Sequence, residues 1–168
     1  MELETKTYSY FDEAKKWLPS VIMLPVIVYL VINRGIYTMI DNADLVIHEG
    51  GHIVFMIFGS FIYTAGGTLM QILLPSLIIF YFFRNFYKTG IQVSMLWLGQ
   101  NLINISVYAA DARAHKLRLL GNGRLYHDWT YLLSHTGLLE YDTEVGYFFF
   151  GLAILVFLAA LILPYFIE

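Results

Sequence analysis

Apolar residues along the chain gather into five long runs, separated by short polar or glycine-containing breaks. Such runs, with few charged residues inside them, are typical of membrane-spanning helices, which need about 20 apolar residues to cross a bilayer. The pattern therefore predicts an all-α, polytopic membrane helix bundle in a single domain, residues 1–168. The five predicted spans cover residues 17–32, 36–63, 68–83, 91–110 and 145–163.

The breaks between the runs carry ordinary turn signals. Asn33-Arg34-Gly35 separates the first two spans, and Ala65-Gly66-Gly67 is expected to break the chain between the second and the third. The one long polar stretch covers residues 113–142, and it includes a short amphipathic helix that is predicted to open at His127-Asp128-Trp129 and to run to about Leu139. Asp128 precedes an apolar periodic run, so an ordinary N-cap role is one interpretation of this residue.

Two of the spans carry polar residues along one helical face. The stripe in the second span is Tyr37, Asp41, Asp44, His48 and His52, and the stripe in the fourth is Gln100, Asn101, Asn104, Tyr108, Asp111 and His115. Ionisable groups inside a membrane normally face the bundle interior or a cavity. Asp41 and Asp44 lie near the start of their helix, so we expect them near the membrane surface. The amides of Gln100 and Asn101 either join helices or bind a ligand.

Composition supports a membrane protein and limits its chemistry. The chain is 58% hydrophobic and only 14% charged, which is more apolar than a soluble core requires. It contains no cysteine, so disulfides and thiolate metal sites are excluded, and a metal would need His, Asp, Glu or carbonyl ligands. The net charge of −3 and the dispersed basic residues do not indicate nucleic-acid binding.

Five spans would place the two ends of the chain on opposite sides of the membrane. The basic residues on the N-terminal side would then be Lys6, Lys15, Lys16, Arg113, Lys116, Arg118 and Arg124, against Arg34, Arg84 and Lys88 on the other side. Because basic residues favour the cytoplasmic side, the N-terminus and the 113–142 loop are predicted to be cytoplasmic, in a bacterial inner (plasma) membrane. The acidic, aromatic first 17 residues lack a cleavage-site pattern, so we expect a retained lead-in and not a signal peptide.

The sequence His48-Glu49-Gly50-Gly51-His52 is an HExxH motif inside an apolar span. Two histidines four residues apart lie on one face of a helix, where both imidazoles can reach one metal ion. The glutamate between them is placed to take a proton from metal-bound water, which makes Glu49 the candidate general base. The structural alternative is a buried His/Glu hydrogen-bond network without a metal.

A catalytic zinc ion usually takes three protein ligands and leaves a fourth position for water. His48 and His52 supply two of them, and the third must come from elsewhere in the chain. Asp111 is our first candidate because it ends the polar stripe of the fourth span; a salt bridge to Arg113 is its structural alternative. His127 and Asp128, in the polar loop, are the other two candidates.

The HExxH motif inside a membrane helix, followed by an aspartate near a later span, resembles the site-2 protease family of intramembrane zinc metalloproteases. Ala65-Gly66-Gly67 is similar to that family's glycine-containing segment after the motif helix. The segments GGTLMQ, LWLGQNLINISVYAADAR and HDWTYLL also resemble a group of small bacterial membrane proteins.

This resemblance implies a zinc hydrolase that cleaves peptide bonds in or near the membrane. It implies zinc on His48, His52 and Asp111, with Glu49 as general base, and Asn101 or Asn104 holding an unwound substrate strand or its oxyanion. The implied partners are the lipid bilayer and a membrane-protein or peptide substrate. Substrate choice would reside in the spans or in a partner subunit.

Two other functions fit the same residues. One is a transporter or proton-relay protein that uses Asp41, Asp44, His48 and Asp111 through the bilayer, which requires Asp41 and Asp44 to be buried. The other is a membrane metalloenzyme with a non-peptide substrate, such as a lipid amide or ester. Its metal-water chemistry would be the same as that of a peptidase.

Overall fold

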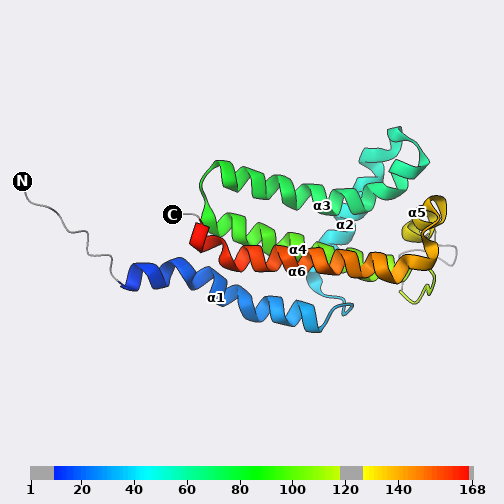
Figure 1. Cartoon of the computed structure of the whole chain (residues 1–168). Helices are drawn as coiled ribbons and strands as arrows, with labels where there is room; N and C mark the ends of the chain where they lie inside the picture. The colour runs from blue at the N-terminus through cyan, green and yellow to red at the C-terminus, as the bar shows by residue number, and fades with distance from the viewer. Residues whose placement is uncertain (1–9, 118–126, 167–168) are drawn as a thin grey trace, which may run out of the picture.

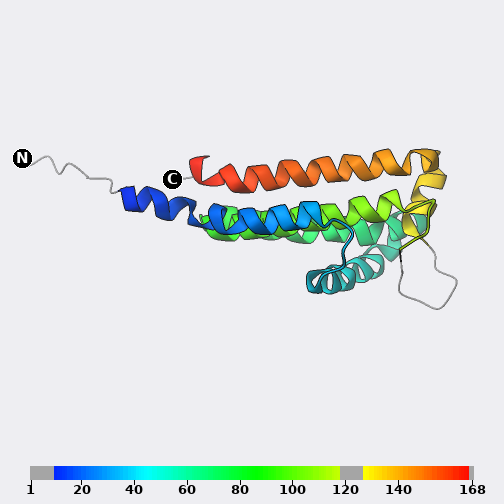
Figure 2. The same cartoon turned by 90° about the horizontal axis from the view of Figure 1, so that it is seen from below.

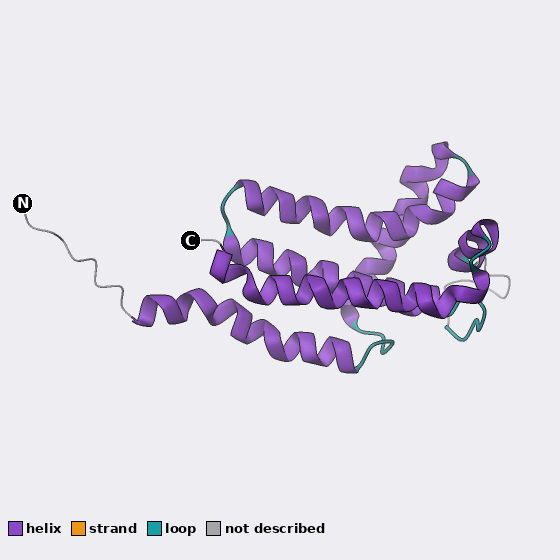
Figure 3. Ribbon diagram, in the orientation of Figure 1, coloured by secondary structure: helices purple, strands orange, loops and turns teal. Residues whose placement is uncertain are grey.

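The computed structural model describes residues 10–117 and 127–166, and the regular secondary structure within these ranges is entirely helical (Figures 1 and 3). The helices in chain order are α1 (Tyr10–Ile32), α2 (Met39–Phe55), α3 (Ser60–Arg84), α4 (Lys88–Ala110), α5 (Asp128–Thr136) and α6 (Asp142–Phe166). Single 3₁₀ turns follow α2 (η1, Met56–Phe58) and precede α6 (η2, Leu139–Tyr141). The predicted all-α fold is therefore confirmed.

Four long helices, α1, α3, α4 and α6, lie side by side and form the body of the bundle (Figures 1 and 2). Helix α4 is central: it packs against α6 and α3, and α1 lies against both α6 and α4. The shorter helix α2 runs across this bundle, behind α4 in Figure 1, lies to one side of it in Figure 2, and packs mainly against α3. The short helix α5 caps one end, where it contacts α3 and α4.

Three stretches are long and apolar enough to cross a membrane: Glu13–Ile32, Ser60–Arg84 and Leu139–Phe166. Their outward faces carry large exposed apolar side chains, as a lipid-facing surface does. The prediction of five spans is not confirmed. Helix α2 has 17 residues, fewer than the roughly 20 that a span requires, and α4 is long enough but carries buried amides.

The segments that lie at each end of the bundle differ from those that the sequence predicts. Helix α1 begins and α6 ends at one end of the bundle, whereas the end of α4, helix α5 and the start of α6 lie at the other end (Figure 1). The reason is that α2 crosses the bundle without spanning its length, so α3 begins at the end where α1 finished. Arg34 accordingly lines the same cavity as Lys116, although the sequence placed these residues on opposite sides. Lys6, Arg118 and Arg124 lie outside the described residues.

The predicted break at Ala65-Gly66-Gly67 is wrong, because these residues lie inside α3. The chain turns earlier, at Gly59, whose φ of +86° is a conformation that favours glycine. Gly66 and Gly67 have another use: a Cβ atom on Gly66 would lie 2.7 Å from the carbonyl oxygen of Gly51. The glycines therefore permit close contact between α2 and α3.

The core lies along α4 and α6, where Leu102, Ile105 and Phe157 are buried among smaller residues. A buried amide joins three helices nearby. Gln92 of α4 donates to the Ser20 hydroxyl of α1 at 2.9 Å and to the Ala160 carbonyl of α6 at 2.8 Å. Hydrogen bonds of this kind help to hold membrane helices together, because lipid is as apolar as the side chains and apolar burial alone does little to join the helices.

Candidate metal centre

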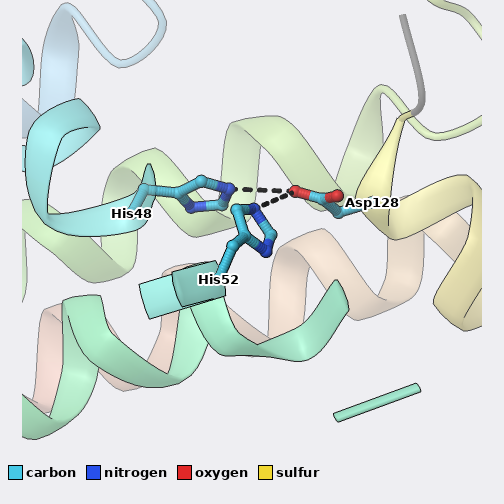
Figure 4. A group of neighbouring side chains, drawn as sticks. All are labelled: His48, His52 and Asp128. Carbon is cyan, nitrogen blue, oxygen red and sulfur yellow. Dashed lines mark hydrogen bonds and ion pairs between the residues drawn. The ribbon is translucent and has the colours of Figure 1, made fainter. Parts of the chain in front are cut away.

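Both motif histidines lie on the buried face of α2. His48 is 7% exposed and His52 is 8% exposed, and their rings meet edge to face with centroids 4.9 Å apart. The spacing of four residues places them on adjacent turns of one helix, as the sequence predicts. Their Nε2 atoms are both directed toward the start of α5 (Figure 4).

Asp128, the first residue of α5, stands opposite the two histidines. Its Oδ2 atom is 2.9 Å from Nε2 of His48 and 3.3 Å from Nε2 of His52 (Figure 4). In the part of the chain that the structure describes, these three residues are the one group of His, Asp and Glu side chains whose candidate ligand atoms converge, all within 4.8 Å of one another. Ligand atoms about 2.0 Å from a tetrahedral zinc ion would themselves be roughly 3.3 Å apart.

The second nitrogen of each imidazole determines what the first can do. Nδ1 of His52 is 2.8 Å from the Tyr63 carbonyl oxygen, which can only accept, so this nitrogen donates its proton. Nδ1 of His48 lies 3.0 Å from Oε1 of Gln71 and is held in the same way. In the neutral imidazoles, both Nε2 atoms then present lone pairs to one carboxylate oxygen. The lone pairs of the two nitrogens and of the carboxylate oxygen repel one another, whereas a cation between them would attract all three atoms. The three residues therefore fit a metal ion.

The charge state of Asp128 also suits a ligand. Burial raises the pKa of this carboxyl, but the hydrogen bonds and positive charges that His48 and His52 supply when their Nε2 atoms are protonated lower it by more, so the net shift of the Asp128 pKa is downward. Asp128 does not cap α5, because that position belongs to His127, whose Nδ1 accepts from the Thr130 N–H at 3.3 Å. The carboxylate is therefore free to face α2.

Tyr108 of α4 fixes the position of Asp128. Its hydroxyl lies 3.4 Å from Oδ2 of Asp128 and accepts from the backbone N–H of the same residue at 3.2 Å. The Tyr108 ring also packs edge to face against His48, with centroids 5.8 Å apart. One side chain thus touches the aspartate and one of the histidines.

The packing of α2 on α3 makes room for the histidines. A Cβ atom on Gly67 would lie 2.4 Å from Nε2 of His48, so this ring occupies space that only glycine leaves open. A Cβ atom on Gly51 would lie 2.2 Å from the Gly66 carbonyl oxygen. Gly51 therefore permits close packing of α2 on α3. Gly50 meets no atom within 4 Å.

The structure does not bring Asp111, the first candidate for the third ligand, to the histidines. Its carboxylate accepts from the backbone N–H groups of Lys116 and Leu117, at 2.8 and 3.0 Å, and so closes the turn after α4. Its expected alternative partner, Arg113, instead forms an ion pair with Asp142 at 2.6 Å. The group that converges on the histidines is Asp128, the alternative named from the sequence.

His127, the other alternative ligand, faces away from the cluster. Its Nε2 atom is 3.7 Å from Oδ2 of Asp111, and its ring stacks on that of His115 with centroids 5.1 Å apart. Burial lowers the pKa of His127, and the neighbouring His115 lowers it further. His127 therefore belongs to the turn that holds Asp128 in place.

The candidate general base, Glu49, is exposed, and its carboxylate forms no hydrogen bond or ion pair with the described residues. Because Glu49 directly follows His48 on the helix, its side chain starts beside the cluster and is not held by another group. A carboxylate of this kind can accept and return a proton.

Asn101 and Asn104, expected to position a substrate, contact other residues. The Asn101 amide donates to Asp44 at 3.2 Å, and the Asn104 amide donates to Asp41 at 2.6 Å and to Asp44 at 3.1 Å. Asp41 and Asp44 are 7% and 1% exposed, so protein covers both carboxylates. The two polar stripes of the sequence thus face each other.

The sequence does not predict which groups orient the side chains of His48, His52 and Asp128. Gln71 was visible only as the single amide of its span, and Tyr108 only as one member of a polar stripe. The Tyr63 carbonyl has no sequence signal, because every residue carries one. Comparisons of the chain with protein-family models, curated proteins and solved structures find no match.

Proposed function

We propose that this chain is a zinc-dependent hydrolase of the membrane, with His48, His52 and Asp128 as the metal ligands and Glu49 as the general base. The observation that carries the proposal is the convergence of both Nε2 atoms on Oδ2 of Asp128, at 2.9 and 3.3 Å. Three protein ligands of the His₂-carboxylate type leave a fourth zinc position for water, as in catalytic zinc sites.

A bound zinc ion would supply a water of near-neutral pKa and a Lewis acid for the substrate carbonyl. The Glu49 carboxylate would take the proton from the attacking water and return it to the leaving group. The Tyr63 carbonyl and Gln71 would keep both histidines in the tautomer that binds metal, and Tyr108 would hold Asp128.

The proposed substrate is a peptide bond at or within the membrane. Two features support it: the HExxH spacing, which metallopeptidases share, and the attachment of the cluster to a bundle that has three helices able to cross a bilayer. Asn101 and Asn104 are not proposed as substrate contacts, because their amides are committed to Asp41 and Asp44.

The hydrolase is tested by Glu49→Gln, which removes the base and keeps the shape of the side chain. The purified full chain, loaded with zinc in detergent, is incubated with fluorescently labelled single-span peptides. We expect Glu49→Gln to retain zinc and to lower cleavage by about 10²- to 10⁴-fold, the usual contribution of a general base. Glu144→Gln, which changes an exposed glutamate of α6, should cleave like the wild type. Equal cleavage by wild type and Glu49→Gln would exclude the proposed role.

A further inference from the structure

A cavity of about 350 Å³ opens where the end of α1, the end of α4 and the start of α6 meet. Small residues form part of its wall: Ser106 and Ala110 of α4, and Gly146 of α6. A Cβ atom on Gly146 would lie 2.7 Å from that of Ala110, so α4 and α6 are in close contact at this point. The volume is sufficient for a small ligand. No residue of the proposed zinc site lines the cavity.

Two basic side chains line the cavity without acidic partners. Arg34 follows the end of α1, and Lys116 follows the end of α4. Both are exposed, and among the described residues neither side chain forms an ion pair with a carboxylate. Arg113, which does not line the cavity, differs in this respect because it pairs with Asp142 at 2.6 Å. The two cations of the cavity are therefore available to an anionic ligand.

The cavity wall also contains one acidic residue, Asp111, whose carboxylate is already engaged. It accepts from the backbone N–H groups of Lys116 and Leu117, at 2.8 and 3.0 Å. The same turn fixes the backbone of Lys116 beside the cavity. With two cations and one carboxylate, the wall carries a net positive charge, and such a wall attracts anions.

Aromatic rings of α6 hold Arg34 at the cavity. Its guanidinium carbon lies over the ring of Phe150, 4.7 Å from the centroid, and 5.5 Å from the ring centroid of Tyr147. Contacts of this kind are electrostatic and require no hydrogen bond from the guanidinium. Its N–H groups donate to no other residue in the part of the chain that the structure describes. They form a planar fork that matches two oxygens of a phosphate group.

The cavity lies beside the ends of two stretches that are able to cross a bilayer. Arg34 comes shortly after the Glu13–Ile32 stretch, and Tyr147 lies in the first turns of the Leu139–Phe166 stretch. Lipid phosphate groups are located just outside the hydrocarbon core, where a spanning helix ends, and tyrosine is enriched at the same depth. Basic pockets between membrane helices bind such phosphate groups.

We propose that this cavity binds a phosphate group, with Arg34 and Lys116 as its charged contacts. The headgroup of an anionic phospholipid presents a phosphate at the membrane boundary, and soluble phosphate has the same chemistry. A bound phosphate would join the end of α1 to the end of α4. The proposal does not depend on the zinc site, with which the cavity shares no residue.

Two ligands distinguish the lipid from the soluble source. The purified full chain in an uncharged detergent is mixed with dioleoyl phosphatidylglycerol, and native mass spectrometry counts the lipid molecules bound per chain. Dioleoyl phosphatidylcholine, whose phosphate is balanced by its own cation, is the lipid control. Calorimetry with inorganic phosphate tests the soluble source. We expect one saturable site per chain that prefers phosphatidylglycerol to phosphatidylcholine.

Arg34→Gln and Lys116→Gln each remove one cation from the cavity, and each should weaken binding about fivefold. Both residues are exposed, so the variants should fold like the wild type. Arg84→Gln is the matched control, because Arg84 is an exposed arginine at the end of another apolar stretch, Ser60–Arg84, and does not line the cavity. It should bind like the wild type.

Loss of phosphatidylglycerol binding in the two cavity variants would support a lipid headgroup, and loss of inorganic phosphate binding in them would support a soluble phosphate. The proposal is overturned if the wild type shows no preference for phosphatidylglycerol and binds inorganic phosphate more weakly than about 10 mM. It is also overturned if both cavity variants bind as tightly as the wild type, or if Arg84→Gln weakens binding as much as they do.

Discussion

At the scale of single residues, the site depends on which nitrogen of each histidine is already engaged. The Tyr63 carbonyl and Gln71 hold Nδ1 of His52 and His48, at 2.8 and 3.0 Å, and leave the Nε2 atoms for Asp128 or a metal. Groups that orient a ligand in this way typically contribute 10- to 100-fold to metal affinity.

Gln71→Leu tests this orientation. The leucine is similar in size but cannot accept the Nδ1 proton of His48, so we expect zinc affinity to fall by about 10- to 100-fold. Competition with a fluorescent zinc chelator measures the change. Gln92→Leu, which removes a buried amide between α1, α4 and α6, is the control and should leave zinc affinity unchanged. Equal affinities for wild type and Gln71→Leu would show that the His48 tautomer does not depend on this amide.

The sequence predicts which residues of one helix share a face, but it does not predict which distant residues the fold brings together. The spacing of His48 and His52 alone indicates a shared helical face. The third ligand is 80 residues from His48 along the chain, and both Asp111 and Asp128 have the right chemistry. Only the turn after α4, closed by the Asp111 carboxylate on the backbone N–H groups of Lys116 and Leu117, distinguishes them.

At the scale of helices, the crossing of α2 and α3 positions the histidines. Gly51 and Gly66 bring the two backbones into contact, and Gly67 leaves space for the His48 ring. The sequence Ala65-Gly66-Gly67 predicts a break in the chain, whereas Gly66 and Gly67 lie inside α3 and permit close packing. Glycine pairs mark either a turn or a close approach, and local sequence does not separate these two uses.

Gly51→Ala tests the crossing. Its Cβ atom would meet the Gly66 carbonyl oxygen, which belongs to the backbone and cannot rotate away. We expect the free energy of unfolding to fall by about 1–3 kcal/mol and zinc affinity to weaken, because α2 would have to move. Chemical denaturation in detergent and a zinc titration measure the two effects.

Gly50→Ala is the matched control one residue away. Its Cβ atom would meet no atom within 4 Å, and alanine is the better helix former, so stability should be unchanged or slightly higher. Similar losses in Gly50→Ala and Gly51→Ala would contradict a specific role for the crossing.

At the scale of the whole molecule, hydropathy indicated the helices but not their paths. The apolar runs at 17–32, 91–110 and 145–163 lie inside α1, α4 and α6. Their ends fall within a few residues of the helix ends, except that α1 begins earlier, at Tyr10. Helix α2, however, crosses the bundle, so the start of α1 and helix α5 lie at opposite ends, whereas counting each apolar run as a span predicts that they lie on the same side (Figure 1). Periodicity reports which face of a helix is apolar but not the direction in which the helix runs.

The folded chain brings α2, α3, α4 and α5 together around one carboxylate oxygen, and the central claim is that this point holds zinc. Metal analysis of the purified full chain tests it most directly, with wild type, Asp128→Ala and Asp111→Ala measured side by side. We predict about one zinc ion per chain in the wild type and in Asp111→Ala, and loss of zinc in Asp128→Ala. Wild-type protein without zinc, or zinc kept by Asp128→Ala and lost by Asp111→Ala, would contradict the assignment.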